Sequence, residues 1–331
     1  MNSPQPFSDD QFARYYRRRT LELWPEDGDP LDRLARHALL PQGKLLRPRL
    51  FLLCMAALGG DPGQAAALAV ALEGHHTASL VHDDLIDGDA ERRGRPSVPA
   101  GFGATQALLG GDAMLCRYFA DLAEHRLEGV GPRRQLDFIA LVGSTGVEVC
   151  RGQLLEERLR GDLDCGTDAY LAMVTMKTAA LLRGTCLAAA LLTGAAPAVA
   201  EALADYGEAL GIAFQIRDDL LPYRDEGARR AAGKPSRSDL RNLRPTLPVL
   251  LAMERAAPRQ ARRLRRLVPR AGRGPRALGE LTALLRELGA LDGAAGLLRG
   301  HAERARGRLA ALPAGEHRER LAALARTVEV F

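Results

Sequence analysis

Five long segments of the 331-residue chain carry alanine and leucine at the spacing of one helix face. This pattern constrains the fold most, because only a helix keeps residues at that spacing on one side. Aromatic residues make up 5% of the chain, whereas strands favour aromatic and β-branched residues. The segments are 65–82, 104–128, 134–160, 168–194 and 198–221. The sequence therefore predicts an all-α protein.

The cellular location is predicted from the absence of transmembrane, secretion and CxxC patterns. No run of 18 uncharged apolar residues is found, so no transmembrane helix is expected. The N-terminus is polar and does not resemble a secretion signal. The five cysteines are scattered without a CxxC pair, which is typical of free thiols in a reducing compartment. We therefore expect a cytoplasmic protein.

Lysine is almost absent from the chain. Of the 46 basic residues, only Lys44, Lys177 and Lys234 are lysines, and the net charge is +5. A general bias towards arginine would leave lysine mainly where a compact ammonium is needed and a guanidinium does not fit. Survival by chance is the alternative. The three lysines are therefore candidate functional residues.

A second charge feature lies between Arg255 and Arg276, where arginine and alanine dominate. Such a segment could bind RNA, DNA or an acidic membrane. It lacks the interleaved aromatic residues of a base-stacking surface, and its basic residues alternate with apolar ones at helical spacing. The sequence therefore favours a solvated helix face, and no nucleic-acid partner is predicted.

The first acidic motif, Asp83-Asp84-Leu85-Ile86-Asp87, follows a long apolar helix. On a helix Asp83 and Asp87 lie one turn apart on the same face, where like charges repel. A hard divalent cation would offset that repulsion, and oxygen-only ligands favour Mg²⁺. A solvated acidic helix end is the alternative. It fits less well because three basic residues follow directly: Arg92, Arg93 and Arg95.

The second acidic motif, Asp218-Asp219, again ends an apolar helix. Two such pairs, each followed by basic residues, indicate two metal-binding walls facing one cavity. Lys177-Thr178 lies on a third apolar helix, and Lys234 follows the second motif within a polar, Gly- and Pro-rich segment, 227–246. Each lysine therefore lies in or beside a segment suited to phosphate binding.

Taken together, these motifs resemble the trans-isoprenyl diphosphate synthases, or polyprenyl synthetases. The resemblance extends from about residue 40 to 250 in the family's order. It rests on Gly43-Lys44-Leu45-Leu46-Arg47-Pro48, His76 to Pro96, Gly111-Asp112-Ala113, Gly152-Gln153, Lys177-Thr178, Phe214 to Asp219, Gly233-Lys234-Pro235, Asp239-Leu240, and Pro245-Thr246-Leu247-Pro248.

The resemblance implies one catalytic domain over residues 1–331, an isoprenoid-synthase helical bundle around a deep central cavity, usually as a homodimer. It implies condensation of an allylic diphosphate with isopentenyl diphosphate. A cluster of Mg²⁺, expected to hold three ions, would be bound by Asp83, Asp87 and Asp218, with Asp84 and Asp219 in support. The allylic diphosphate would contact Arg92, Lys177, Thr178, Gln215 and Lys234. The isopentenyl diphosphate would contact Lys44, Arg47, His76 and Arg93.

Two positions depart from the family pattern. Pro222 replaces the third acid of the second motif, so the helix should kink or end there and the metal cluster could be altered. Arg244 stands where the family has a second loop lysine, which keeps the charge but changes its shape.

Product length is predicted from Ala78 and Ser79, about one turn before Asp83. Family members that stop early carry aromatic residues there, so two small residues predict a product of twenty carbons or more. A second gate could still lie deeper in the bundle, with Phe102, Tyr118 and Phe119 as candidates.

Other functions stay open. A terpene cyclase would share the aspartates but has no need for Lys44, Arg47, His76 and Arg93 together. A non-catalytic partner subunit would typically lose the first motif's aspartates, and this chain keeps all three. The residues favour a chain-elongating prenyltransferase.

Overall fold

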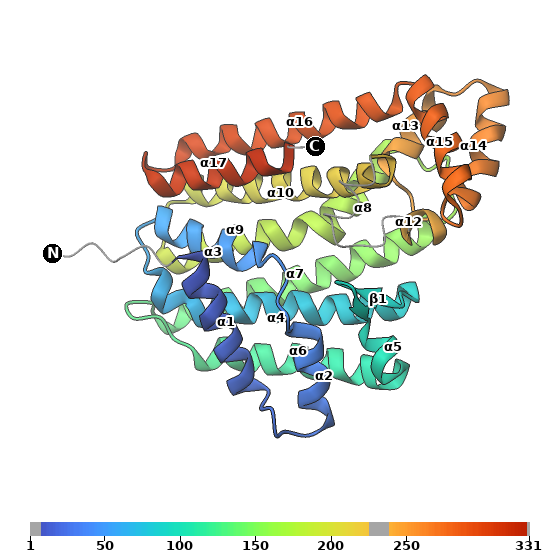
Figure 1. Ribbon diagram of the computed structural model, residues 1–331. Helices are drawn as coiled ribbons and strands as arrows, with labels where there is room; N and C mark the ends of the chain where they lie inside the picture. The colour runs from blue at the N-terminus through green and yellow to red at the C-terminus, as the bar shows by residue number, and fades with distance from the viewer. Residues whose placement is uncertain (1–7, 225–237, 330–331) are drawn as a thin grey trace. The chain divides into compact units, whose positions relative to one another are not determined.

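The computed structural model describes residues 8–224 and 238–329 of the chain. Almost all of these residues lie in helices (Figure 1). The described strands, β1 (Glu91–Arg92) and β2 (Arg95–Pro96), form a short antiparallel hairpin. The predicted all-α class is therefore confirmed.

The chain divides into two compact units, each built from several stretches of sequence. Unit 1 comprises residues 1–144, 184–204 and 310–321, and unit 2 comprises 145–183, 205–309 and 322–331. That residues 1–331 act as one catalytic domain stays a prediction. The unit boundaries lie within α7 (Pro132–Leu159), α9 (Ala180–Thr193), α10 (Pro197–Leu220), η3 (Leu309–Ala311) and α17 (Glu316–Glu329).

Unit 1 contains short helices around one long helix, and capping residues in the sequence set where several of them begin. Ser8 caps the first helix, and Asp29 and Asp61 each accept backbone N–H bonds before a proline at the first helical position. The helices are α1 (Asp9–Leu23), α2 (Pro30–Leu39), α3 (Leu46–Ala57), α4 (Pro62–Asp87), α5 (Val98–Phe102) and α6 (Ala104–Glu124).

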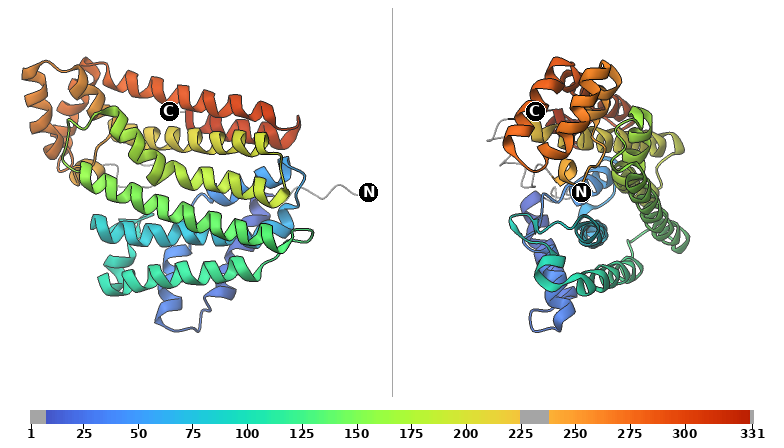
Figure 2. Two further views of the ribbon diagram at one scale, coloured as in Figure 1. Left: turned by 180° about the vertical axis from the view of Figure 1, so that it is seen from behind. Right: turned by 90° about the vertical axis from the view of Figure 1, so that its right-hand side faces the viewer.

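The helices α4 and α6 run side by side through unit 1 (Figure 2). Two glycines permit this close approach. A Cβ atom on Gly74 would overlap the ring of Tyr118, and one on Gly111 would overlap the imidazole of His82. The segment Ala65–Ala71 is fully or almost fully buried, because small side chains let neighbouring elements close around α4.

Unit 2 is built around the apolar helix α13, whose residues from Leu247 to Ala252 are all buried. Each buried leucine of this kind stabilises the fold by about 2 kcal/mol. The remaining elements are α8 (Gly166–Val174), the π-helix η1 (Thr175–Ala179), η2 (Leu221–Tyr223), α12 (Ser238–Arg241), α13 (Leu247–Arg255), α14 (Pro258–Ala271), α15 (Pro275–Glu287) and α16 (Ala290–Arg308).

One helical stretch among the described residues, Gly166–Thr193, is long and apolar enough to cross a membrane by length and composition. It comprises α8, η1 and α9, and 44% of its most apolar window is buried. A core helix passes the same test, so this finding is weak evidence for a membrane span. The expectation of no transmembrane segment stays a prediction.

Candidate active site

The first acidic motif lies at the carboxyl end of α4. Gly88 follows the helix with φ 63°, a left-handed conformation that glycine adopts without strain, and its N–H donates to the carbonyl of Asp84. Asp83 and Asp87 are partly exposed, whereas Asp84 is 1% exposed. The motif therefore presents two carboxylates one turn apart on α4 and buries the third.

The buried carboxylate of Asp84 is held by Arg92. The Arg92 Nε lies 2.7 Å and 2.8 Å from the two carboxylate oxygens, and Nη2 lies 2.6 Å from Oδ1. Burial raises the pKa of Asp84, and the hydrogen bonds from Arg92 oppose that rise. Both oxygens of Asp84 are thus engaged by a guanidinium, which suits a supporting role.

The hairpin β1–β2 places the arginines that follow the motif. Arg93 (φ 54°) and Gly94 (φ 70°) form its tip, where both residues need positive φ. The Arg93 guanidinium lies over Gly43, since a Cβ there would be 2.8 Å from Nη2, and its Nη1 donates to the carbonyl of Pro41 at 3.3 Å. Arg93 is therefore fixed beside the segment that carries Lys44.

The segment 43–48 leads into α3. Lys44 is exposed, and Leu45 adopts a left-handed conformation (φ 49°) before the helix begins. Arg47 lies in the first turn, where burial lowers its pKa and the charge of Glu73 raises it. Glu73, 4% exposed, has its pKa raised by burial and lowered by the charges of Arg47 and Arg93. Arg47 and Arg93, two of the four predicted isopentenyl diphosphate ligands, therefore interact electrostatically with the buried Glu73.

His76, the remaining predicted ligand of this set, lies on α4 one turn after Glu73 and is partly exposed. Ser79 donates its hydroxyl to the His76 carbonyl at 2.7 Å. The structure thus places Arg47, Arg93 and His76 on or beside the part of α4 that precedes the aspartates.

Ala78 is fully buried and Ser79 is partly buried. Phe119 of α6 meets the ring of His75 edge-on, with centroids 4.3 Å apart, one helical turn before Ser79. Burial lowers the pKa of His75 to about 4. Of the other gate candidates, Tyr118 is fully buried beneath Gly74, and Phe102 packs on His37 at 5.2 Å.

The second acidic motif ends α10 in unit 2. Asp218 is partly exposed, and its Oδ1 lies 3.3 Å from Nη2 of Arg217. Asp219 is 2% exposed and accepts three hydrogen bonds: from the Tyr170 hydroxyl (2.7 Å), from Gln215 Nε2 (2.9 Å) and from the Leu247 N–H (2.8 Å). Burial raises the pKa of Asp219 to about 7, although all three hydrogen bonds lower it. Asp219 therefore ties α8, α10 and α13 together.

Lys177 and Thr178 lie in the π-helix η1, a local widening that is frequent at functional sites. Gly152 of α7 closely approaches the backbone of Lys177, where a Cβ would overlap it. The Thr178 hydroxyl donates to Gln215 Oε1 at 3.0 Å, and Gln215 in turn bonds Asp219. Two residues of the predicted allylic site, Thr178 and Gln215, are thus joined in one hydrogen-bond chain with Asp219 of the second acidic motif.

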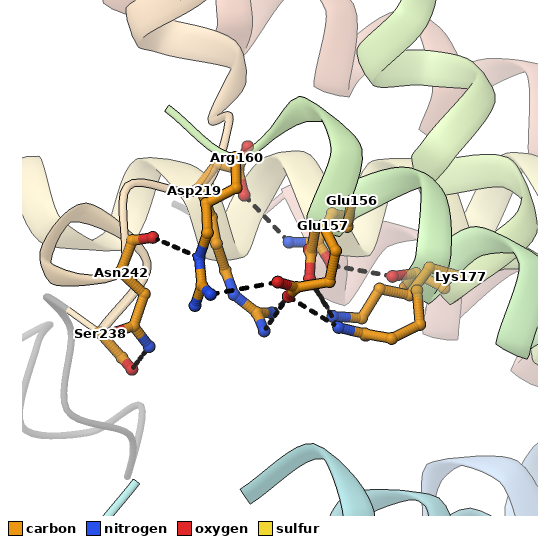
Figure 3. Close-up of polar contacts among 11 residues, drawn as sticks. Glu156, Glu157, Arg160, Lys177, Asp219, Ser238 and Asn242 are labelled. Atoms are coloured by element: carbon orange, nitrogen blue, oxygen red, sulfur yellow. Dashed lines mark hydrogen bonds and ion pairs between the residues drawn. The ribbon is translucent and has the colours of Figure 1, made fainter. Parts of the chain in front are cut away.

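A buried acid on α7, Glu156, holds two cations of unit 2 (Figure 3). The Glu156 Oε2 lies 2.6 Å from Nζ of Lys177 and 2.6 Å from Nη1 of Arg244. Glu156 and Arg244 are 7% and 6% exposed. The neighbouring Glu157 pairs with Arg160 at 3.1 Å, and Arg160 also donates to the Asn242 carbonyl. Glu156 therefore fixes both cations through one oxygen.

No group of three or more His, Cys, Asp or Glu side chains in residues 8–224 and 238–329 is arranged to hold a metal ion by itself. A Mg²⁺ ion commonly binds through one or two carboxylates, with water and substrate phosphates completing its shell. The partly exposed Asp83 and Asp87, one turn apart, fit that donor set. Lys234 lies outside the described residues.

The chain matches the polyprenyl synthetase family model over residues 29–285. It is 36% identical to a short chain isoprenyl diphosphate synthase of Methanothermobacter thermautotrophicus, covering 90% of this chain and 89% of that one. Among solved structures, the geranylgeranyl pyrophosphate synthetase of Pyrococcus horikoshii has a TM-score of 0.88 at 30% identity, covering 97% and 98% of the two chains. The chain belongs to the polyprenyl synthetase family.

A further structural relative is a polyprenyl synthase from Caulobacter crescentus complexed with calcium and isoprenyl diphosphate. Its TM-score is 0.85 at 31% identity, and 99% of each chain is covered. The predicted family is thereby confirmed, and so is the isoprenoid-synthase fold. The roles of individual site residues stay predictions.

The structure shows where both departures from the polyprenyl synthetase pattern, Pro222 and Arg244, lie. The helix α10 ends at Leu220, and Pro222 lies buried in the 3-10 turn η2, as its ring and missing N–H predict. Arg244 is buried against Glu156, so its guanidinium is used inside unit 2.

Sequence reasoning missed the buried acids Glu73 and Glu156. Glu73 is the one charged residue between Ala65 and Ala78, which was an available signal. Glu156 follows the Gly152-Gln153 landmark, but its partners Lys177 and Arg244 are distant in sequence. Only the tertiary structure shows that it holds both.

Proposed function

We propose that this protein is a Mg²⁺-dependent trans-prenyltransferase. It joins isopentenyl diphosphate to an allylic diphosphate and releases pyrophosphate and an all-trans polyprenyl diphosphate of twenty carbons or more. The names of its relatives support the reaction, and their products range from farnesyl to geranylfarnesyl and octaprenyl diphosphate. Ala78 and Ser79, both small, support the longer products.

The observation that carries the proposal is the pattern of the two acidic motifs. In each, one carboxylate is buried in fixed hydrogen bonds and its neighbour is left partly exposed at the end of a helix. Exposed carboxylates at a helix end, with basic residues following, are suited to a metal–diphosphate complex. Lys44, Arg47, His76 and Arg93 add the cationic set that an elongating enzyme needs for its second diphosphate.

In this account Asp83, Asp87 and Asp218 would hold the Mg²⁺ ions, and bound Mg²⁺ would supply the positive charge that stabilises the pyrophosphate leaving group. Three ions are proposed. Asp84 orients Arg92, and Asp219 fixes the backbone at Leu247.

The protein side chains position both diphosphates. Lys177, Thr178, Gln215, Arg92 and Lys234 bind the allylic diphosphate, whose C–O bond breaks with the electron pair leaving on pyrophosphate. The isopentenyl double bond then attacks the allylic carbon, and the new C–C bond forms. The proton lost from the adduct is taken by the departing pyrophosphate, so no separate side-chain base is required.

We further propose a cytoplasmic homodimer. Exposed leucines on α6 and α7 support self-association, because Leu108, Leu109 and Leu136 are 49%, 60% and 64% exposed. All three belong to unit 1.

The test is product analysis by mass spectrometry after incubation with Mg²⁺, isopentenyl diphosphate and one allylic primer at a time, from five to twenty carbons. We expect a ladder of prenyl diphosphates that reaches at least twenty carbons. Absence of elongation with every primer would overturn the proposal.

Pro222 favours one second candidate, a terpene cyclase, because it removes an acid of the second motif. A cyclase would consume a prenyl diphosphate without isopentenyl diphosphate and give hydrocarbons or alcohols. The same product analysis separates the two reactions.

A further inference from the structure

The strongest concentration of charge in the described structure lies on α14, the turn that follows it and the first residues of α15. Residues 258–276 contain eight arginines and no acidic residue. Because the whole chain carries only +5, the rest of the chain has a slight negative excess. The positive charge of this protein is therefore segregated onto one short segment of unit 2.

Five of these arginines lie on one face of α14. Their spacing confines them to an arc of about 100° and a length of about 16 Å, at 100° and 1.5 Å per residue. All five are exposed, and none has an ion-pair partner in residues 8–224 and 238–329. We call them the arginine face: Arg259, Arg262, Arg263, Arg266 and Arg270.

The opposite side of α14 is used by the core of unit 2. Leu264, Leu267, Val268 and Ala271 are buried, and α14 packs against α15 and α12 (Figure 1). No apolar stripe of this helix is left to insert into a lipid bilayer. Any partner of the arginine face must therefore be recognised by charge, through contacts that salt weakens.

The arginine face does not stabilise the helix that carries it. Residues three and four apart on a helix are neighbours, so the five like charges repel one another. Arg265 lies off this face and pairs with Asp164 at 2.7 Å. A general preference for arginine over lysine explains the residue type, but not the exclusion of acids from the segment.

We propose that the arginine face docks the protein reversibly onto membranes rich in anionic phospholipids. Clusters of four to eight basic residues on one helix are typical of such surfaces. Nucleic acid is less well matched, because no aromatic residue stands among residues 258–276 to stack on bases. A long-chain prenyl product is itself membrane-soluble, and this one step of the argument rests on the proposed function.

The test is sedimentation of the purified full-length protein with vesicles, without any substrate, so that the result does not depend on the proposed reaction. Vesicles of phosphatidylcholine alone are compared with vesicles that also contain phosphatidylglycerol. We expect binding to the anionic vesicles only, and loss of that binding when the salt is raised from about 0.1 M to about 0.5 M.

The variant replaces Arg259, Arg262, Arg263 and Arg266 by glutamine, which keeps the helix propensity. We expect its partition onto anionic vesicles to fall by on the order of five hundredfold, since each of the four basic residues near the surface contributes about fivefold. The matched control makes the same change in net charge at four exposed arginines elsewhere: Arg17, Arg33, Arg126 and Arg299. Circular dichroism confirms that both variants are folded.

Three outcomes would overturn the proposal. One is equal binding to neutral and anionic vesicles. Another is an equal loss of binding in the variant and the matched control, which would mean that net charge alone is sensed. The third is tight binding of duplex DNA or single-stranded RNA by a protein that leaves anionic vesicles unbound.

Discussion

The two acidic motifs are alike in sequence but differ in the groups that bond their buried aspartates. Each ends an apolar helix with adjacent aspartates, and each buries the second aspartate while the first stays partly exposed. Asp84 is held by the charged guanidinium of Arg92. Asp219 is held by neutral donors, the Tyr170 hydroxyl, an amide of Gln215 and a backbone N–H.

This difference gives the two buried aspartates different structural roles. Successive residues on a helix point about 100° apart, so one aspartate of a pair can face the core while the other faces the substrate. In unit 1 the buried Asp84 neutralises the guanidinium of Arg92. In unit 2 that task falls to Glu156, which holds Lys177 and Arg244, and Asp219 ties backbone segments together.

The largest effect is expected at an exposed aspartate. Asp83→Ala should lower turnover by at least about a thousandfold, because it removes a ligand of the ions that stabilise the leaving pyrophosphate. Its melting temperature should stay close to that of the wild type. Asp137→Ala is the control, since Asp137 forms an exposed pair with Arg133 in unit 1. Full turnover in Asp83→Ala would contradict the metal assignment.

The two buried aspartates should contribute differently to the free energy of unfolding. Asp84→Asn should lower the free energy of unfolding by about 3 kcal/mol at pH 7, because it leaves the charge of Arg92 without its partner. Asp219→Asn should cost about 1 kcal/mol, since the three groups that donate hydrogen bonds to Asp219 are neutral. Urea unfolding measures both. Equal losses would remove the contrast between the motifs.

Glu156 should contribute more to kcat/KM than the adjacent Glu157. Glu156→Gln should lower kcat/KM for the allylic diphosphate by about thirtyfold, or about 2 kcal/mol, because two adjacent cations lose their shared acid. Glu157→Gln is the matched control, and its effect should be within about twofold. Equal values of kcat/KM in Glu156→Gln and Glu157→Gln would reduce Glu156 to a packing residue.

A last effect concerns acid stability in unit 1. His75 has a folded pKa of about 4, below its ordinary value of 6.5, so the folded protein binds fewer protons than the unfolded chain. The contribution of neutral His75 to the free energy of unfolding is therefore fully present above about pH 6.5. It is lost as the pH falls towards 4, by about 1 kcal/mol per pH unit. His75→Gln should lose less stability than the wild type between pH 7 and pH 5 in urea unfolding. The same loss in both proteins would assign the acid sensitivity to other groups.

The helices were largely predictable because their apolar residues repeat locally. The predicted segments 65–82, 104–128, 134–160 and 198–221 correspond to α4, α6, α7 and α10 within a few residues. The segment 168–194 was predicted as one helix. Its interruption by the π-helix η1 depends on packing around Lys177, which no local pattern records.

The site residues were predictable as a set, but their environments were not. The acidic motifs indicate carboxylates at helix ends, yet which aspartate is buried depends on Arg92 in one case and on Tyr170 and Leu247 in the other. Tyr170 is distant in sequence from Asp219. Glu73 and Glu156 escaped prediction for the same reason, since a buried acid is identified by partners that the fold brings to it.

The most direct test of the central claim is the release of pyrophosphate from an allylic diphosphate, measured with Mg²⁺ in the presence and absence of isopentenyl diphosphate. The account predicts that release requires both, and that chelation of Mg²⁺ abolishes it. Equal release without isopentenyl diphosphate would contradict the account and indicate a cyclase or a hydrolase.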